Sequence, residues 1–444
     1  MKICKIIIKD FHQFKDFELD LTHPETGEPL EKVCFIGSNG TGKTKLLNTI
    51  NHFFSAQTVN DVPLTYLKLQ DETLSRSIWA VFTQENKAFF DENIEDYKGW
   101  EEEIHTIIRK TDLEFQYALT SNSSLDDYVI EDAINQLNPT LAIFCPAELE
   151  KTVEFLDVPQ TNLNDSLKLF EQFPSNHIVS NETITDFWKT LIYHLKKRDN
   201  DFLEFQNVEE NQNRTVREVK EMFDQQHPKI LDSLAKLWDE ILGKAGLEFD
   251  AAGASNPIQL TDNLKAYIKL KSTGERINYN DLSTGIRNFI FKVGHIYSLY
   301  FNRPIERGFL LVDEPENSLF PDFLYDLVDI YRRITHNTQI FMATHNPIIA
   351  AQFEPYERFV LEFDEQGYVR ARRGTVPVGD DPNDILSKDF GVRSLLGKEG
   401  VKKWERYIEL RTLIKLTENK EEKSRMLDEF MRIGNEYNFA NAVS

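Results

Sequence analysis

The chain has 444 residues, 41% of them hydrophobic, which is enough to bury a sizeable core in two or three domains. Its 73 acidic and 51 basic residues give a net charge of −22, so the whole molecule repels polyanions. Three scattered cysteines without a Cys-x-x-Cys pair indicate neither a disulfide nor a zinc site. No apolar run reaches the roughly 18 residues of a membrane span, and no leader pattern is present, so we expect a cytoplasmic protein without a membrane partner.

Any contact with DNA must therefore be local. Three short basic clusters are candidates, although such clusters are more often the exposed face of a helix or strand. They are Lys196-Lys197-Arg198, Arg332-Arg333, and Arg370 with Arg372-Arg373.

The first 36 residues predict strands, at Ile6–Ile8, around Phe17 and Leu19, and at Lys32–Ile36. A loop that fits the phosphate-binding pattern G-x-x-x-x-G-K-[ST] follows directly. It consists of Gly37, Ser38, Asn39, Gly40, Thr41, Gly42, Lys43 and Thr44. In this pattern backbone N–H groups wrap the phosphates, Lys43 neutralises the outer ones, and the Thr44 hydroxyl faces Mg²⁺. Apolar residues at helical spacing after the loop, from Leu46 to Phe53, supply the strand, loop and helix context that the motif requires.

Residues 55–140 are difficult to divide, and they end in the apolar strand pattern of 141–145. Residues 151–250 are polar and mainly helical in pattern, with the clearest helix between Pro228 and Gly243. A hairpin of two strand patterns, 266–270 and 276–279, then leads into the next motif.

That motif is Leu282-Ser283-Thr284-Gly285, which stands before a core-facing helix pattern over 286–300. A hydroxyl residue and a glycine ahead of a helix can form a donor-rich nest for a phosphate. Helix capping by Ser283 is the alternative, and the string alone favours capping. Its position between the hairpin and the acidic strand described next favours the phosphate nest.

Two apolar strand patterns end in groups suited to phosphate chemistry. Residues 308–312 lead into Asp313 and Glu314, and residues 339–344 lead into His345. We expect Asp313 to hold Mg²⁺ and Glu314 to orient and polarise the water that attacks the γ-phosphate. His345 is placed to hydrogen-bond that phosphate. The tail from Leu395 predicts one or two charged helices.

Together these motifs resemble the ABC-type ATPase head of SMC-like repair proteins, OLD-family ATPases and bacterial anti-phage ATPases. Glu316 to Leu319 lie where that family has its D-loop. The resemblance implies that ATP and Mg²⁺ are bound and that two heads pack head to tail. Ser283, Thr284 and Gly285 of one subunit would then contact ATP held by the other, in a dimer or larger homo-oligomer. Gln70 and Gln84 are both candidates for the Q-loop glutamine.

The implied fold is α/β, a P-loop ATPase head with a mixed central sheet and an antiparallel β-subdomain. We expect the head at 1–150 and 251–365, a helical insertion lobe at 151–250, and a helical C-terminal region at 366–444. More than half of the chain separates Thr44 from Leu282, unlike the compact arrangement of transporter ATPases. Acids at Asp380, Asp381 and Asp384 lie in a loop pattern rather than on the strands of a TOPRIM nuclease, so we expect no nuclease site.

Three functions stay open at this point. The stretch Asp381–Leu386 with Phe390-Gly391-Val392 resembles the ATPase subunits (PtuA) of Septu-type anti-phage systems, which work beside a separate HNH nuclease. The first hypothesis is thus a defence ATPase that controls a separately encoded effector nuclease, with an HNH enzyme favoured. The second is a stand-alone SMC-like DNA-binding or repair ATPase, against which the net charge argues. The third is a regulator or toxin-system component in which ATP binding matters and hydrolysis is vestigial, against which Glu314 argues.

Overall fold

The computed structural model describes most of the chain as two compact units, Met1–Gly379 and Asp380–Ser444. The described residues are 1–9, 11–54, 64–71, 76–82, 106–109, 116–120, 141–147, 176–179, 194, 197–227, 229–249, 268–277, 282–317, 319–379, 381–392 and 394–439.

A seven-stranded sheet forms the centre of the first unit, in the order β15-β14-β3-β13-β12-β8-β9. All neighbouring pairs are parallel except β14 and β15. The strands are β3 (Lys32–Gly37), β8 (Leu141–Cys145), β9 (Asn176–Ile178), β12 (Gly308–Asp313), β13 (Thr338–Ala343), β14 (Arg358–Phe363) and β15 (Val369–Arg373). The predicted α/β fold with a mixed central sheet is confirmed. Strand β9 lies within the range that the sequence indicated to be mainly helical.

The register of the parallel strands aligns the ends that carry the motifs. Asp313 pairs with Ala343, and Ala343 pairs with Phe35, so β12, β13 and β3 end at one edge of the sheet. Since side chains alternate between the two faces of a strand, Asp313 lies on the same face as Phe309 and Leu311. That face belongs to the main hydrophobic core.

A second, antiparallel sheet has the order β2-β1-β4-β5-β7-β6. Its strands are β1 (Lys2–Lys9), β2 (Phe17–Asp20), β4 (Leu64–Asp71), β5 (Arg76–Phe82), β6 (Thr106–Arg109) and β7 (Gln116–Thr120). It is the antiparallel subdomain that the resemblance implied. Four of its strands come from the range 55–140, which the sequence pattern did not resolve.

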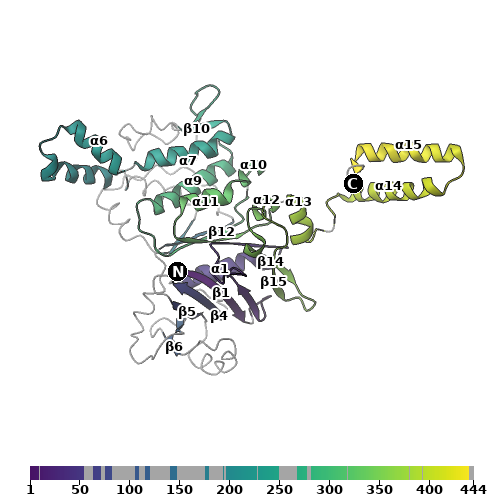
Figure 1. Cartoon of the computed structure of the whole chain (residues 1–444), viewed down its shortest axis with the longest axis horizontal. Coiled ribbons are helices and arrows are strands. Elements are labelled where there is room, and N and C mark those ends of the chain that lie inside the picture. Colours follow the sequence, from purple (N-terminus) through teal and green to yellow (C-terminus); the bar gives the residue numbers. More distant parts are fainter. Residues whose placement is uncertain are drawn as a thin grey trace. The chain divides into compact units, whose positions relative to one another are not determined.

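Helix α1 (Lys43–Phe54) lies under the central sheet on the side of the antiparallel sheet (Figure 1). Its buried residues Leu46, Leu47 and Ile50 share one core cluster with side chains of both sheets, including Ile6 and Phe341. The predicted helical spacing after the phosphate loop is therefore a buried stripe. Packing of this stripe fixes the helix, and with it the loop, against the sheet edge.

One buried glutamine joins the two sheets. Gln339, on β13, is fully buried; its Oε1 accepts the N–H of Ile3 at 2.7 Å. Its Nε2 donates to the carbonyl oxygens of Ile3 at 2.9 Å and Leu30 at 2.8 Å. One side chain thus forms hydrogen bonds with three buried backbone groups of β1 and of the segment before β3.

Helices α9 and α11 cover the opposite face of the central sheet from α1 (Figure 1). In the part of this unit that the structure describes, residues 197–207 are helical, and the further helices are α6 (Val216–Gln226), α7 (Ile230–Lys244), α9 (Thr284–Tyr300), α10 (Pro321–Leu324), α11 (Leu327–Ile334) and α12 (Pro347–Ala350). Short 3₁₀ turns occupy η2 (Glu209–Asn211) and η5 (Pro355–Glu357). Strands β10 (Leu247–Phe249) and β11 (Ile268–Leu270) form a separate pair.

The second unit contains the turn α13 (Pro382–Asp384), the π-helical turn η6 (Ile385–Asp389), and a hairpin of α14 (Lys398–Leu416) and α15 (Lys420–Glu436). Tyr407 and Phe430 stack at 4.1 Å between ring centroids in the small core of the hairpin. The Arg406 guanidinium and the Glu429 carboxylate join the two helices at 3.0 Å. Among the described residues, no helix is both long and apolar enough to cross a membrane.

Candidate nucleotide site

The phosphate-loop pattern forms a tight turn between β3 and α1. Lys43 is only 6% exposed, and its ammonium donates to the carbonyl oxygens of Gly37 at 2.9 Å and Ser38 at 3.1 Å. Burial lowers the pKa of Lys43 from 10.5 to about 8, and the carboxylates of Glu314, Asp313 and Glu316 oppose that shift. The loop therefore holds a desolvated cation at the start of a helix, which is the arrangement that recognises phosphate.

Two positions of the loop require glycine, because neighbouring atoms leave no room for a Cβ and because φ is positive there. At Gly42, with φ of +89°, an added Cβ would lie 2.4 Å from Nε2 of Gln13 and 2.6 Å from the ring of Phe14. At Gly37, with φ of +150°, it would lie 2.3 Å from the Leu361 carbonyl oxygen. Gln13 also donates to the carbonyl oxygen of Gly40 at 3.2 Å. The loop before β2 thus packs on the phosphate loop, and the sequence carried no signal for this contact.

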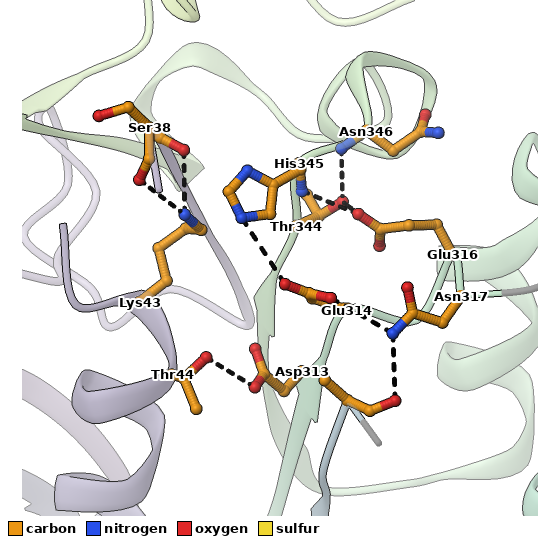
Figure 2. A network of polar contacts seen from close by, with 12 residues as sticks. Ser38, Lys43, Thr44, Asp313, Glu314, Glu316, Asn317, Thr344, His345 and Asn346 are labelled. Carbon is orange, nitrogen blue, oxygen red and sulfur yellow. Dashed lines mark hydrogen bonds and ion pairs between the residues drawn. The ribbon is translucent and has the colours of Figure 1, made fainter. Parts of the chain in front are cut away.

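Thr44 and Asp313 form the predicted metal pair. The Thr44 hydroxyl donates to Oδ2 of Asp313 at 2.8 Å, and the second carboxylate oxygen, Oδ1, is buried without a hydrogen-bond partner among the described residues (Figure 2). Burial raises the pKa of Asp313, which is 2% exposed. Hydroxyl and carboxylate oxygens are the ligands that Mg²⁺ prefers, and an unsatisfied carboxylate oxygen is suited to a cation. These two residues fit the metal.

Glu314 and His345 face one another at the end of the two strands. Oε1 of Glu314 lies 3.6 Å from Nε2 of His345, and the dashed lines of Figure 2 mark this contact. Burial lowers the pKa of His345, with the Lys43 charge adding to the shift, so the imidazole is neutral at pH 7. Glu314 adopts a φ of +42°, a strained value for a residue with a side chain. Its N–H donates to the carbonyl oxygen of Ala343 at 2.8 Å, which ties it to β13.

Two further residues join this network without having been assigned roles there from the sequence. Oε1 of Glu316 accepts the Thr344 hydroxyl at 2.7 Å and the His345 N–H at 2.8 Å. The Asn317 amide donates to Oε2 of Glu314 at 3.2 Å and to the carbonyl oxygen of Ala147 at 3.1 Å. A second acid two positions after Glu314 was the signal that the sequence offered for Glu316.

The Ser283-Thr284-Gly285 string does not join the phosphate loop within the described part of this chain. Ser283 is exposed at the start of α9, and its hydroxyl accepts the N–H of Ile286 at 3.4 Å. Gly285 is buried. Of the two Q-loop candidates, Gln70 lies on β4, and Gln84 lies outside the described residues.

Several of the basic side chains that were candidates for a DNA contact form ion pairs with acidic residues. Arg198 is bonded to Asp224, and Arg333 pairs with Glu240 at 2.8 Å. Arg370 pairs with Asp364 at 3.1 Å and Arg372 pairs with Glu362 at 3.2 Å. Their charges are compensated locally, which weakens the attraction each offers to a phosphate backbone.

Several solved structures are similar to this chain. The "SMC head domain from Thermotoga maritima" has 12% sequence identity and a TM-score of 0.40, and the match covers 85% of this chain and 100% of that chain. The "SmcHead bound to the C-winged helix domain of ScpA" has 11% identity and a TM-score of 0.41, and the match covers 85% of this chain and 99% of that chain. A third structure is an Smc head domain with an extended coiled coil, bound to the C-terminal domain of ScpA derived from Pyrococcus furiosus. It has 10% identity and a TM-score of 0.38, and the match covers 84% of this chain and 96% of that chain.

A family profile described as an AAA ATPase domain matches residues 1–350. The matched range covers most of the chain and includes the phosphate loop, the strand that ends in Asp313 and Glu314, and His345. The chain therefore belongs to the AAA ATPase domain family.

Proposed function

We propose that this ATPase closes around ATP as a head-to-tail dimer and thereby controls a separately encoded effector nuclease in bacterial anti-phage defence. The observation that carries the catalytic part is the convergence of Lys43, Thr44, Asp313, Glu314 and His345 at one sheet edge. Lys43 and Thr44 begin helix α1, and the other three residues stand at the ends of the adjacent parallel strands β12 and β13. Their arrangement matches the positioning and charge stabilisation on which phosphoryl transfer depends.

Each side chain has a distinct task in this proposal. Lys43 neutralises phosphate oxygens, and Thr44 and Asp313 would hold Mg²⁺, which supplies further positive charge to the phosphates when bound. Glu314 accepts a hydrogen bond from the attacking water and orients it. Neutral His345 donates one ring N–H to the γ-phosphate, and its 3.6 Å contact with Glu314 keeps both groups on the same side of the site.

The dimeric part of the proposal draws on Ser283. Its side chain is exposed at the N-terminus of a 17-residue helix, where unpaired N–H groups attract anions. No hydrogen bond among the described residues joins it to the phosphate loop of its own chain. An exposed donor corner of this kind is available to nucleotide held by a second copy.

Control of a separate effector draws on the tail. Asp381 caps α13 by accepting the N–H of Asn383 at 2.9 Å, and Asp384 pairs with Lys388 at 2.6 Å. These acids have local structural partners, which supports their assignment to a folded turn rather than to a nuclease centre. Together with the resemblance of 381–392 to PtuA subunits, this favours an ATPase whose output is the activity of a partner.

Glu314→Gln tests the catalytic and dimeric parts together. We expect turnover to fall by about 10²–10³-fold, because the amide cannot accept a proton from water. ATP should still bind, so light scattering should show a dimer or larger oligomer that persists with ATP. Asp329→Asn, an exposed acid on α11, serves as the control and should behave as wild type. A wild-type protein without ATP turnover that stays monomeric with ATP would refute the proposal.

Co-expression with the adjacent reading frame tests the effector. We expect an HNH-type nuclease to co-purify with the chain and its DNA cleavage to depend on the nucleotide present. Neighbouring repair genes, together with salt-dependent binding of duplex DNA by the chain alone, would favour a repair ATPase instead.

A further inference from the structure

The Glu316 side chain is partly buried beside the reacting groups, and its hydrogen bonds go to residues at the His345 corner. One oxygen, Oε1, accepts two hydrogen bonds, from the Thr344 hydroxyl at 2.7 Å and from the His345 N–H at 2.8 Å (Figure 2). The Thr344 hydroxyl also accepts the N–H of Asn346 at 2.9 Å. The three consecutive residues Thr344, His345 and Asn346 are thus tied, directly or through the Thr344 hydroxyl, to one carboxylate.

Burial makes this carboxylate costly. Its second oxygen, Oε2, is buried and has no hydrogen-bond partner among the described residues. Burial also raises the pKa of the Glu316 carboxyl group. A carboxylate with a buried, unsatisfied oxygen lowers the stability of a fold, so its presence here calls for an explanation. The two hydrogen bonds that Glu316 accepts, from the Thr344 hydroxyl and the His345 N–H, are the interactions that offset this cost.

Asn317, the next residue, holds the other reacting group. Its amide donates to Oε2 of Glu314 at 3.2 Å and is anchored by the Ala147 carbonyl oxygen at 3.1 Å. Glu314 to Asn317 form a tight turn, in which the N–H of Asn317 donates to the Glu314 carbonyl at 3.2 Å, and the N–H of Leu319 donates to the Glu316 carbonyl at 3.0 Å. One short turn therefore contacts both groups: Asn317 bonds the Glu314 carboxylate, and Glu316 bonds the His345 backbone.

We propose that Glu316 is a positioning residue for hydrolysis: it fixes the His345 backbone, and the turn it shares with Asn317 aligns the histidine with the Glu314 carboxylate. Glu316 acts only through His345 and contacts no phosphate. This inference rests on the proposed ATPase function. A displacement of the histidine of only about 1 Å would misalign it with the γ-phosphate, and displacements of that size can cost about 100-fold in rate.

The test is a double-mutant cycle between Glu316→Ala and His345→Ala, with ATP affinity and turnover measured separately. We expect Glu316→Ala to lower kcat by about 10–100-fold while the Kd for ATP changes by less than about twofold. In the His345→Ala background, Glu316→Ala should cause no further loss, because the histidine it positions is already absent. Glu316→Gln retains an oxygen acceptor and should keep most of the activity.

Two more variants guard against an effect on folding alone. Thr344→Val removes one of the two donors at similar volume and should lower kcat in the same direction as Glu316→Ala. Glu357→Gln alters a buried carboxylate that pairs with Lys32 at 3.1 Å, where Lys32 begins β3 at the end opposite the phosphate loop, and it should leave kcat unchanged even if stability falls.

The inference is overturned if Glu316→Ala lowers kcat equally in both backgrounds, weakens ATP binding as much as turnover, or has no effect. A wild-type protein that does not hydrolyse ATP would instead refute the function on which the inference rests. The wild-type rate thus separates the two failures.

Discussion

At the scale of single residues, the proton on Lys43 decides whether the loop carries a positive charge. Burial is the main cause of its lowered pKa, and nearby carboxylates reduce the shift without cancelling it. Below pH of about 8 the free protein holds a charged ammonium, whereas above it the amine is mostly neutral. Binding of a polyanion favours the charged form, so binding above this pH must be accompanied by proton uptake.

We therefore expect the affinity for ATP to fall as pH rises from about 8 to 10, by up to about tenfold per pH unit. Titration with a fluorescent ATP analogue checks this, and calorimetry in buffers of different ionisation enthalpy should detect the proton uptake. Lys43→Arg keeps its charge throughout this range, so any binding that it retains should be nearly independent of pH. A flat wild-type profile would show that Lys43 stays charged in the free protein.

At the scale of elements, the site depends on how β13 is held between its neighbours. His345 follows this strand, and the strand is joined to β1 and to the segment before β3 through the side chain of Gln339. The three backbone groups bonded by Gln339 are buried. If these hydrogen bonds were lost, water could not replace them.

Gln339→Leu tests the joint between the sheets. We expect it to lower the free energy of unfolding by about 2–4 kcal/mol, because Ile3 and Leu30 lose their partners for three backbone groups. Chemical denaturation measures this. Met342→Leu, a conservative change at a fully buried position on the other face of β13, should cost less than about 1.5 kcal/mol. Equal effects of the two substitutions would show that the hydrogen bonds contribute little.

At the scale of the whole molecule, the proposed dimer divides each catalytic site between two chains. Lys43, Asp313 and Glu314 belong to one subunit, and Ser283 is expected to come from the other. A two-fold symmetric dimer then contains two composite sites, and variants that disable different halves should complement one another.

Mixing Lys43→Ala with Ser283→Arg tests this division. Each variant alone should be inactive, but a mixed dimer has one intact site, so random mixing should restore up to about a quarter of wild-type turnover. Mixing Lys43→Ala with Glu314→Gln is the control, since both defects fall in the same half and no intact site forms. An active Ser283→Arg protein, or a mixture as inactive as its components, would contradict the shared site.

The amino-acid sequence by itself determined the parts of this protein that depend on local order. The phosphate loop between β3 and α1 was predicted because glycine spacing and a 3.6-residue apolar period are short-range signals. For the same reason the helix after Pro228 and the helix after Ser283 were predicted close to where the structure has them, and the tail from Leu395 was predicted to be helical. The acids that end β12 and the histidine after β13 were also found locally.

Only the tertiary structure decided the contacts that cross between elements. Glu316 reaches the His345 corner because β12 and β13 pair in one particular register, and Gln13 packs on the phosphate loop because the loop before β2 folds over it. Strands β4 to β7 and β9 were missed because their identity depends on partners distant in sequence rather than on periodicity within a short window. Register and packing are set by the whole core, so neither can be inferred from one segment alone.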